Sequence, residues 1–98
     1  MFDVIESDVF QIWMAELRDR QARNRIAARI TRMVQGNFGD WKAIQGGVSE
    51  MRIDHGPGYR VYFTRRGTKL ILLLCGGDKR TQAADIKRAL KMADELED

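Results

Sequence analysis

The spacing of apolar residues changes near Val48, and this change constrains the fold more than any other feature of the sequence. Before Val48, apolar side chains recur every three or four residues, as in helices that bury one face. After it they alternate: Met51 and Ile53 fall on one side of the chain, and Glu50 and Arg52 on the other. Successive side chains of a strand point to opposite faces, so the sequence predicts helices followed by strands.

Three strands are predicted after this point, separated by the turn signals Gly56-Pro57-Gly58 and Arg65-Arg66-Gly67. The third strand, Leu70 to Cys75, is apolar at every position, which favours a central strand covered on both faces. Gly76-Gly77 is expected to end it. Strands joined by tight turns pair in antiparallel fashion, so this segment predicts a three-stranded meander.

Two helices are predicted before the strands. Ser7 is the expected N-cap of the first, and Phe10 and Trp13 lie on its apolar face. The apolar stripe breaks at residues 18–21 and a new one starts at Ala22, which predicts a helical hairpin instead of one long helix. Residues 2–6 alternate weakly, as in a short strand, and residues 37–47, with three glycines, are expected to form a loop.

A last helix is predicted after the strands, with Thr81 as its cap and Ile86 and Leu90 on its apolar face. The acidic residues 94–98 are expected to fray. A chain of 98 residues is the size of one domain. The sequence therefore predicts a single α+β domain over residues 1–98: an N-terminal strand, a helical hairpin, a three-stranded antiparallel meander and a C-terminal helix.

Composition favours a cytoplasmic protein without metal or cofactor. Cys75 is the only cysteine and follows an apolar run, so we expect a buried thiol and no disulfide. No segment reaches the roughly 20 apolar residues of a membrane span, and the acidic residues 1–10 do not resemble a signal peptide. The chain has one histidine and no carboxylate cluster at metal-ligand spacing.

Basic residues concentrate in two segments of a chain whose net charge is +3. Residues 18–32 hold six arginines and one aspartate, and residues 52–80 hold seven basic side chains and two aspartates. Such segments favour anionic partners. In the first segment, Arg25, Arg29 and Arg32 share the helix face opposite the apolar stripe, which is typical of either a solvated face or a docking surface.

The second segment predicts a phosphate-binding surface. Arg52 and Arg60 fall on one face of neighbouring strands, and Lys79 and Arg80 follow the end of the third strand, where loops present side chains to ligands. Guanidinium groups bind phosphate through paired hydrogen bonds. The cluster therefore suits RNA cleavage, in which a 2′-hydroxyl attacks phosphorus and negative charge grows on the phosphoryl oxygens.

Further side chains near this cluster are candidates for binding RNA or moving a proton. Tyr59 and Tyr62 are candidates for stacking against bases. Three basic residues at the second turn are candidates for contacts with RNA phosphates: Arg65, Arg66 and Lys69. His55 is a candidate general acid or base, because histidine titrates near neutral pH, although its alternation places it on the face opposite Arg52. An exposed turn residue without a catalytic role is the alternative for His55.

Residues 47–90 resemble the core of the RelE/ParE superfamily of bacterial toxins. The segments GPGYRVYF, LLLCGGDKRTQ and DIKRAL carry the resemblance, which is closest to the HigB-like addiction module killer proteins. The predicted helical hairpin fits as well, so the resemblance spans essentially the whole chain. It implies the toxin of a type II toxin–antitoxin system, an enzyme that cleaves mRNA on the translating ribosome and is silenced by a small helical antitoxin, often with a helix-turn-helix DNA-binding module.

The resemblance also implies roles for particular residues. Arg60 and Arg80 match positions where RelE-like toxins place active-site arginines, and Arg52 falls near another of their basic positions. The face formed by Arg25, Arg29 and Arg32 is then a candidate for antitoxin docking or ribosome contact.

One departure from the RelE-like pattern leaves two functions open. RelE-like nucleases often carry a Tyr or His on or after the last helix as catalytic base or stacking group, and here the matching residue is Ile86. His55, Asp78 and Asp85 are the candidate replacements. ParE-like relatives inhibit DNA gyrase by binding it and need no nuclease residues, so gyrase inhibition is the alternative function.

Overall fold

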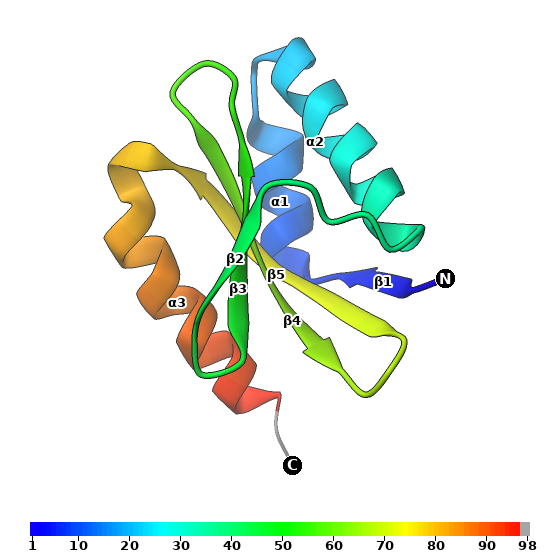
Figure 1. Cartoon of the computed structure of the whole chain (residues 1–98). Helices are drawn as coiled ribbons and strands as arrows, with labels where there is room; N and C mark the ends of the chain where they lie inside the picture. The colour runs from blue at the N-terminus through cyan, green and yellow to red at the C-terminus, as the bar shows by residue number, and fades with distance from the viewer. Residues whose placement is uncertain (97–98) are drawn as a thin grey trace.

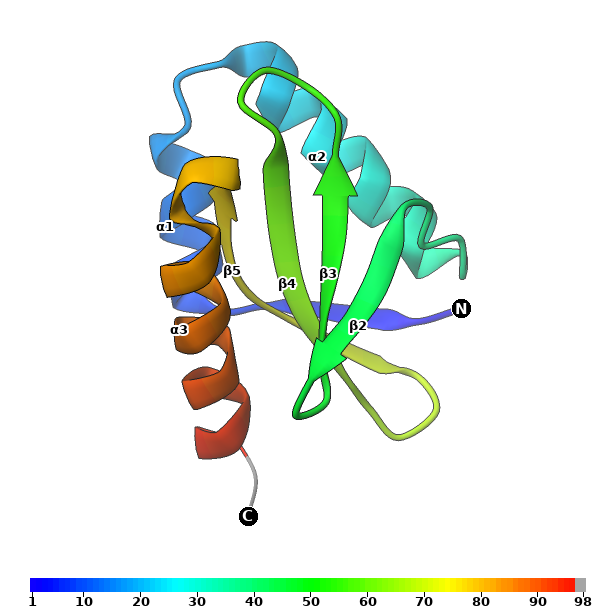
Figure 2. The same ribbon diagram turned by 60° about the vertical axis from the view of Figure 1, so that its left-hand side comes forward.

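The computed structural model describes residues 1–96. They form a mixed β-sheet with helices on both faces (Figures 1 and 2). In chain order its elements are β1 (Asp3–Glu6), α1 (Asp8–Glu16), α2 (Arg20–Val34), β2 (Trp41–Gln45), β3 (Val48–Ile53), β4 (Tyr59–Arg66), β5 (Leu70–Asp78), the 3-10 helix η1 (Lys79–Thr81) and α3 (Gln82–Glu95). The predicted α+β architecture is confirmed. Of the acidic tail expected to fray, residues 97 and 98 lie outside the described residues.

The strands follow the order β1-β5-β4-β3-β2. The meander is confirmed, because β3 pairs antiparallel with β4 and β4 pairs antiparallel with β5. The N-terminal strand β1 completes one side by pairing in parallel with β5, with Asp3 opposite Leu70. Within residues 1–96, β5 is therefore an interior strand between two partners.

Strand β2 corrects the expectation of a loop over residues 37–47. Trp41 pairs with Met51 and Gln45 with Val48, so β2 and β3 form a hairpin. Its turn is Gly46-Gly47, and both residues have positive φ angles of 57° and 78°. Two-residue hairpin turns of this kind require such angles, which glycine adopts without steric cost. The glycines that suggested a loop are thus the turn of a hairpin.

Two hydrophobic cores lie on the two faces of the sheet. Phe10 of α1 and Ile26 of α2 pack with one set of strand residues, whereas Ala89 of α3 packs with Tyr62 and Leu74 on the other face. Figures 1 and 2 show α3 on the opposite side of the sheet from α1 and α2. Successive side chains of β5 point to opposite faces, so Ile71 and Leu73 enter one core and Leu72 and Leu74 the other. The prediction that residues 70–75 are covered on both faces is confirmed.

The ends of the elements show where local sequence signals were correct. Ser7 caps α1 by accepting a hydrogen bond from the Phe10 amide, as predicted. Strand β5 does not end at Gly76-Gly77 but continues to Asp78. Asp78 then caps η1 through a reciprocal pair of hydrogen bonds with the following turn, whereas Thr81 makes no side-chain cap for α3. The helical turn therefore begins after Asp78, because the strand ends three residues later than the predicted Cys75.

Two further observations concern single residues and helices. Cys75 is buried, as predicted, and desolvation is the main reason that the pKa of its thiol rises to about 12. No helix within residues 1–96 is long and apolar enough to cross a membrane.

Candidate nucleic-acid-binding site

A cationic pocket lies where the ends of β3, β4 and β5 meet. Its cavity has a volume of about 280 Å³ and is lined by Asp40, Arg52, Ile53, Asp54, Gly58, Arg60 and Lys79. Arg52 lies directly opposite Arg60 in the β3–β4 ladder, as the alternation predicted. Lys79 enters from η1, just after β5 ends. The structure therefore brings together three of the basic residues that the sequence singled out.

Arg52 is held by a carboxylate of the segment before β2. Its Nη2 donates a 2.7 Å hydrogen bond to Oδ1 of Asp40, and its Nε donates a 3.2 Å bond to the same oxygen. This contact raises the pKa of Arg52 above its ordinary value. The side chains remain 37% and 58% exposed, so the pair lies at the rim of the cationic pocket, where a phosphate can compete with Asp40 for the guanidinium.

Arg60 has a more restrictive environment. Its side chain is only 13% exposed, and its Nε lies 3.4 Å from Oε1 of Glu50, whose side chain is fully buried. The same Glu50 oxygen accepts a 2.8 Å hydrogen bond from Nε2 of Gln82. An arginine buried beside a carboxylate has few alternative rotamers, so Glu50 and Gln82 fix the position from which Arg60 meets a ligand.

Sequence reasoning missed the role of Glu50. Alternation places Glu50 on the same strand face as Arg52 but does not tell whether that face is covered. The structure covers that part of the face with α3, whose contacts extend to β3, β4 and β5. A signal was available: Glu50 sits two residues before Arg52 on the same face, in a strand otherwise rich in buried positions.

Arg80 lies beside a different cavity. A second pocket of about 400 Å³, here called the aromatic pocket, is lined by residues that include Trp13, Tyr59, Arg80, Asp85 and Arg88. Arg80 is highly exposed, and its Nη2 donates a 3.0 Å bond to Asp78. That bond is the main reason that the pKa of Asp78 falls below its ordinary value. Arg80 therefore adjoins the cationic pocket through Lys79 but does not line it.

His55 is turned away from the cationic pocket. Its Nε2 lies 3.0 Å from Oδ2 of Asp19, the N-cap of α2. The histidine therefore belongs to the α2 side of the sheet, as its alternation indicated. Of the other two candidate bases, Asp85 accepts a 2.5 Å hydrogen bond from the Thr81 hydroxyl and Asp78 is engaged by Arg80, so neither carboxylate lines the cationic pocket.

The two candidate stacking residues are both buried. Tyr62 has no exposed surface, and the expectation that it stacks against a base is wrong because α3 covers its ring. Burial, followed by the charge of Glu50, raises the pKa of the Tyr62 phenol. Tyr59 is 8% exposed and packs edge-on against Trp13, with part of its surface at the aromatic pocket.

The basic residues at the second turn lie at the other end of the sheet. Arg65 and Arg66 are the last residues of β4, whereas Arg60 is near its beginning. Five residues of strand place Arg65 about 17 Å from Arg60. Arg65 stacks over the rings of Phe2 and Phe38, and Arg66 donates a hydrogen bond to the Ala93 carbonyl. The structure does not bring these residues, or Lys69 beside them, to the cationic pocket.

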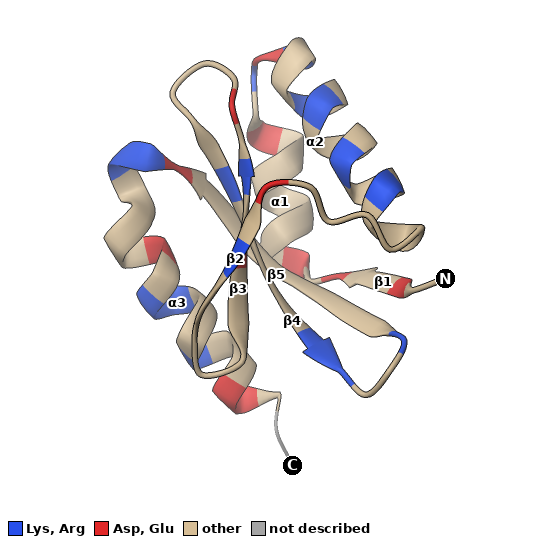
Figure 3. Cartoon of the chain, viewed as in Figure 1, with Lys and Arg blue, Asp and Glu red and all other residues tan. Residues whose placement is uncertain are grey.

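Three of the five arginines of α2, Arg25, Arg29 and Arg32, lie next to the cationic pocket. With Ala28, Ile53 and Asp54 they line a cavity of about 270 Å³, here called the α2 pocket. Arg29 donates hydrogen bonds to the backbone carbonyls of Arg52, Phe38 and Asp40, so it anchors the segment before β2 to α2. Arg25 and Arg32 are exposed on either side of it. Figure 3 shows these basic positions along one side of α2.

Within residues 1–96, no group of three or more His, Cys, Asp or Glu side chains is arranged to hold a metal ion. The side chains that line the cationic pocket supply guanidinium, ammonium and carboxylate groups.

Two comparisons with other proteins identify the family of this chain. Residues 12–97 match the family described as phage derived protein Gp49-like (DUF891). The chain is also 49% identical, over 87 residues, to an uncharacterized protein of Haemophilus influenzae, and the similarity covers 89% of this chain and 88% of the relative. The chain therefore belongs to the Gp49-like family of phage-derived proteins, a family of toxin–antitoxin-type toxins related to the RelE/ParE-like addiction toxins.

Proposed function

We propose that this toxin is a HigB-like endoribonuclease that cleaves mRNA on the ribosome, in the cytoplasm, without a metal ion. The observation that carries the proposal is the convergence of Arg52, Arg60 and Lys79 in one cavity, with Arg60 held in place by buried Glu50. Three cations at one site can bind a phosphodiester and stabilise the charge that grows on its oxygens during cleavage.

The cationic pocket supplies a residue for each part of that reaction. Arg60 is held in one orientation and is the candidate for contacting the phosphoryl oxygens, while Lys79 adds a mobile charge. Two carboxylates line the pocket, and Asp40 is engaged by Arg52. Asp54 makes no ion pair within residues 1–96 and is our candidate for accepting the proton of the attacking 2′-hydroxyl.

Substitution of Lys79 tests this proposal with little risk to the fold, because the side chain is exposed. We expect Lys79→Ala to lower the rate of mRNA cleavage on ribosomes at least tenfold and to relieve growth inhibition. Lys91→Ala is the matched control, since it removes the same charge from an exposed position on α3. Cleavage by Lys79→Ala at the rate of the Lys91→Ala control would contradict the assignment of the site.

Inhibition of DNA gyrase is the second candidate function. It is favoured by one observation: within residues 1–96, no histidine or tyrosine lines the cationic pocket, because His55 bonds Asp19 and Tyr62 is buried. A binding inhibitor needs no such residue. Supercoiling by purified gyrase in the presence of micromolar toxin decides between the two, and an unaffected supercoiling rate excludes this function.

The family implies a cognate antitoxin as partner. We propose that this antitoxin is a small helical protein with a helix-turn-helix module, and that mRNA and the ribosome are the other partners. The face of Arg25, Arg29 and Arg32 is the docking surface that the sequence suggested for it. Co-expression with a neighbouring gene that restores growth would identify the antitoxin.

A further inference from the structure

The α2 pocket and the cationic pocket are two parts of one basic groove. Both are lined by Ile53 and Asp54, the last residue of β3 and the one that follows it. Pairing with β2 begins one residue before Arg52, at Trp41 opposite Met51. The segment before β2 contacts β3 as far as Arg52, whose amide donates a 2.8 Å hydrogen bond to the Asp40 carbonyl. Ile53 and Asp54 lie beyond this contact, and the groove passes over them from the cationic pocket to the α2 pocket.

The charge along this groove has one dominant sign. Its lining includes six cationic side chains, Arg25, Arg29, Arg32, Arg52, Arg60 and Lys79, against the carboxylates of Asp40 and Asp54. Asp40 is paired with Arg52, so Asp54 is the remaining carboxylate at the point where the two pockets join. An extended polyanion gains favourable contacts along the whole groove, whereas a single phosphate can use only one end.

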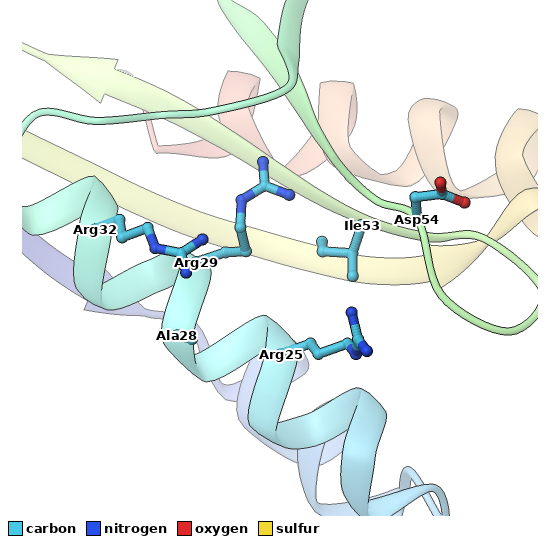
Figure 4. A pocket seen from close by; sticks show the side chains of 6 residues that line it. All are labelled: Arg25, Ala28, Arg29, Arg32, Ile53 and Asp54. Carbon is cyan, nitrogen blue, oxygen red and sulfur yellow. The ribbon is translucent and has the colours of Figure 1, made fainter.

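Of the three arginines that line the α2 pocket, one has a structural role and two are accessible to a ligand. Figure 4 shows Arg29 reaching from α2 toward the strands, with Ile53 and Asp54 across the cavity. The guanidinium group of Arg29 donates hydrogen bonds to backbone carbonyls, including a 2.6 Å hydrogen bond to the carbonyl of Arg52. The side chains of Arg25 and Arg32 are exposed and make no hydrogen bond or ion pair within residues 1–96, so both guanidinium groups can bind phosphates.

We propose that a single strand of RNA held in the cationic pocket continues over the end of β3 into the α2 pocket, where Arg25 and Arg32 bind its phosphates. This inference rests on the proposed ribonuclease function. It reassigns the arginine face of α2 from antitoxin docking to substrate binding. The occupant is single-stranded RNA because the path bends round a sheet edge, which a flexible strand follows and a duplex does not.

The experiment compares two RNA lengths and two double variants. The probes are a uridine dinucleotide, which can fill one pocket, and a uridine oligonucleotide of about eight nucleotides, which can span both. The variants are Arg25→Ala/Arg32→Ala and the control Arg18→Ala/Arg20→Ala. The control removes two exposed arginines that line neither pocket. Affinity is measured by competition against a labelled oligonucleotide at several salt concentrations, and thermal denaturation checks that all proteins are folded.

We expect the Arg25/Arg32 variant to bind the longer RNA about tenfold more weakly than the control does, and the dinucleotide equally well. Loss of two phosphate contacts should also reduce the slope of log affinity against log salt by about 1.4. Equal affinity and slope for the longer RNA in the two variants would overturn the inference. The same result combined with lost antitoxin binding would show that the α2 pocket docks a protein instead.

Assays on ribosomes separate the remaining cases. If the Arg25/Arg32 variant binds free RNA normally but cleaves mRNA slowly on ribosomes, its arginines contact ribosomal RNA and the proposed path is wrong. If cleavage is normal in that variant and impaired in Lys79→Ala, the inference fails alone and the proposed function stands. If the unaltered toxin neither binds RNA nor cleaves mRNA, both fail.

Discussion

At the residue scale, the buried carboxylate of Glu50 distinguishes Arg60 from the other cations of the chain. Arg52 pairs with an exposed aspartate and Arg80 is itself 81% exposed, so either guanidinium can exchange its ion pair for a ligand at little cost. Glu50 has no exposure, and its Oε2 has no hydrogen-bond partner within residues 1–96. Among the cations that line the cationic pocket, Arg60 is therefore the one that lies beside a fully buried carboxylate.

Replacement of Glu50 by Gln should separate the positioning of Arg60 from its charge. Gln keeps the size of the side chain and removes the counter-charge of Arg60. We expect cleavage to slow at least tenfold while RNA affinity changes less than threefold, because Arg60 remains cationic but is no longer held. We also expect a loss of about 3 kcal/mol in the free energy of unfolding.

Single-turnover cleavage and urea denaturation measure the two effects. Gln82→Ala is the comparison, since it removes the 2.8 Å hydrogen bond to Glu50 and leaves the ion pair intact. A Glu50→Gln protein that cleaves at the normal rate would show that Arg60 needs no support from Glu50.

At the element scale, the start of α2 depends on an aspartate that also holds the histidine. Asp19 accepts a hydrogen bond from the Ala22 amide and lies against His55. The hydrogen bond from the Ala22 amide, followed by the hydrogen bond with His55, holds the pKa of Asp19 below its ordinary value of 3.8. A depressed carboxyl pKa stabilises the folded protein above the unfolded pKa, and this contribution is lost as pH falls through the folded value.

Replacement of Asp19 by Ala should therefore lower the melting temperature near neutral pH by a few degrees, and the difference should shrink as the pH falls below 3.8 and the carboxylate becomes protonated. Thermal denaturation at both pH values measures this. Asp19→Asn keeps a side chain that can cap the helix and should recover most of the loss at neutral pH. A difference between the Ala variant and the unaltered protein that is independent of pH would contradict the role of the ionised carboxylate.

The elements also show what alternation can and cannot predict. It placed Arg52 and Arg60 on one face and His55 on the other, because strand geometry alone decides this. It did not show that α3 covers that face at Tyr62 and Glu50, since coverage depends on where a distant helix packs. Strand β2 was not predicted, because the glycines of its hairpin turn, Gly46 and Gly47, are equally typical of a loop.

At the scale of the whole molecule, the basic residues of the second segment are divided between two ends of the sheet. Composition groups residues 52–80 as one basic segment, but Arg60 lies near the start of β4 and Arg65 near its end, as the predicted turn at Arg65-Arg66-Gly67 indicated. Arg65 packs on two aromatic rings and Lys69 lies in the turn after β4, remote from both basic pockets. Net charge could not have predicted this separation.

We expect Lys69→Ala to leave mRNA cleavage within about twofold of the normal rate, although it removes the same charge as Lys79→Ala. At physiological ionic strength a charge more than about 10 Å away is largely screened, so position decides the effect. Cleavage assays of the two variants side by side measure the difference. Equal impairment in both would indicate that bulk charge, and not the cationic pocket, drives RNA binding.

The parallel pairing of β1 with β5 has a consequence for how the toxin matures. Ser7, at the end of β1, donates its hydroxyl to the carbonyl of Leu74, which lies 67 residues later. Contacts of such long range form slowly, and during synthesis they cannot form until the later strand has been made. Lys79 follows directly after that strand, so the basic groove cannot form until β5 has been synthesised and the sheet has closed.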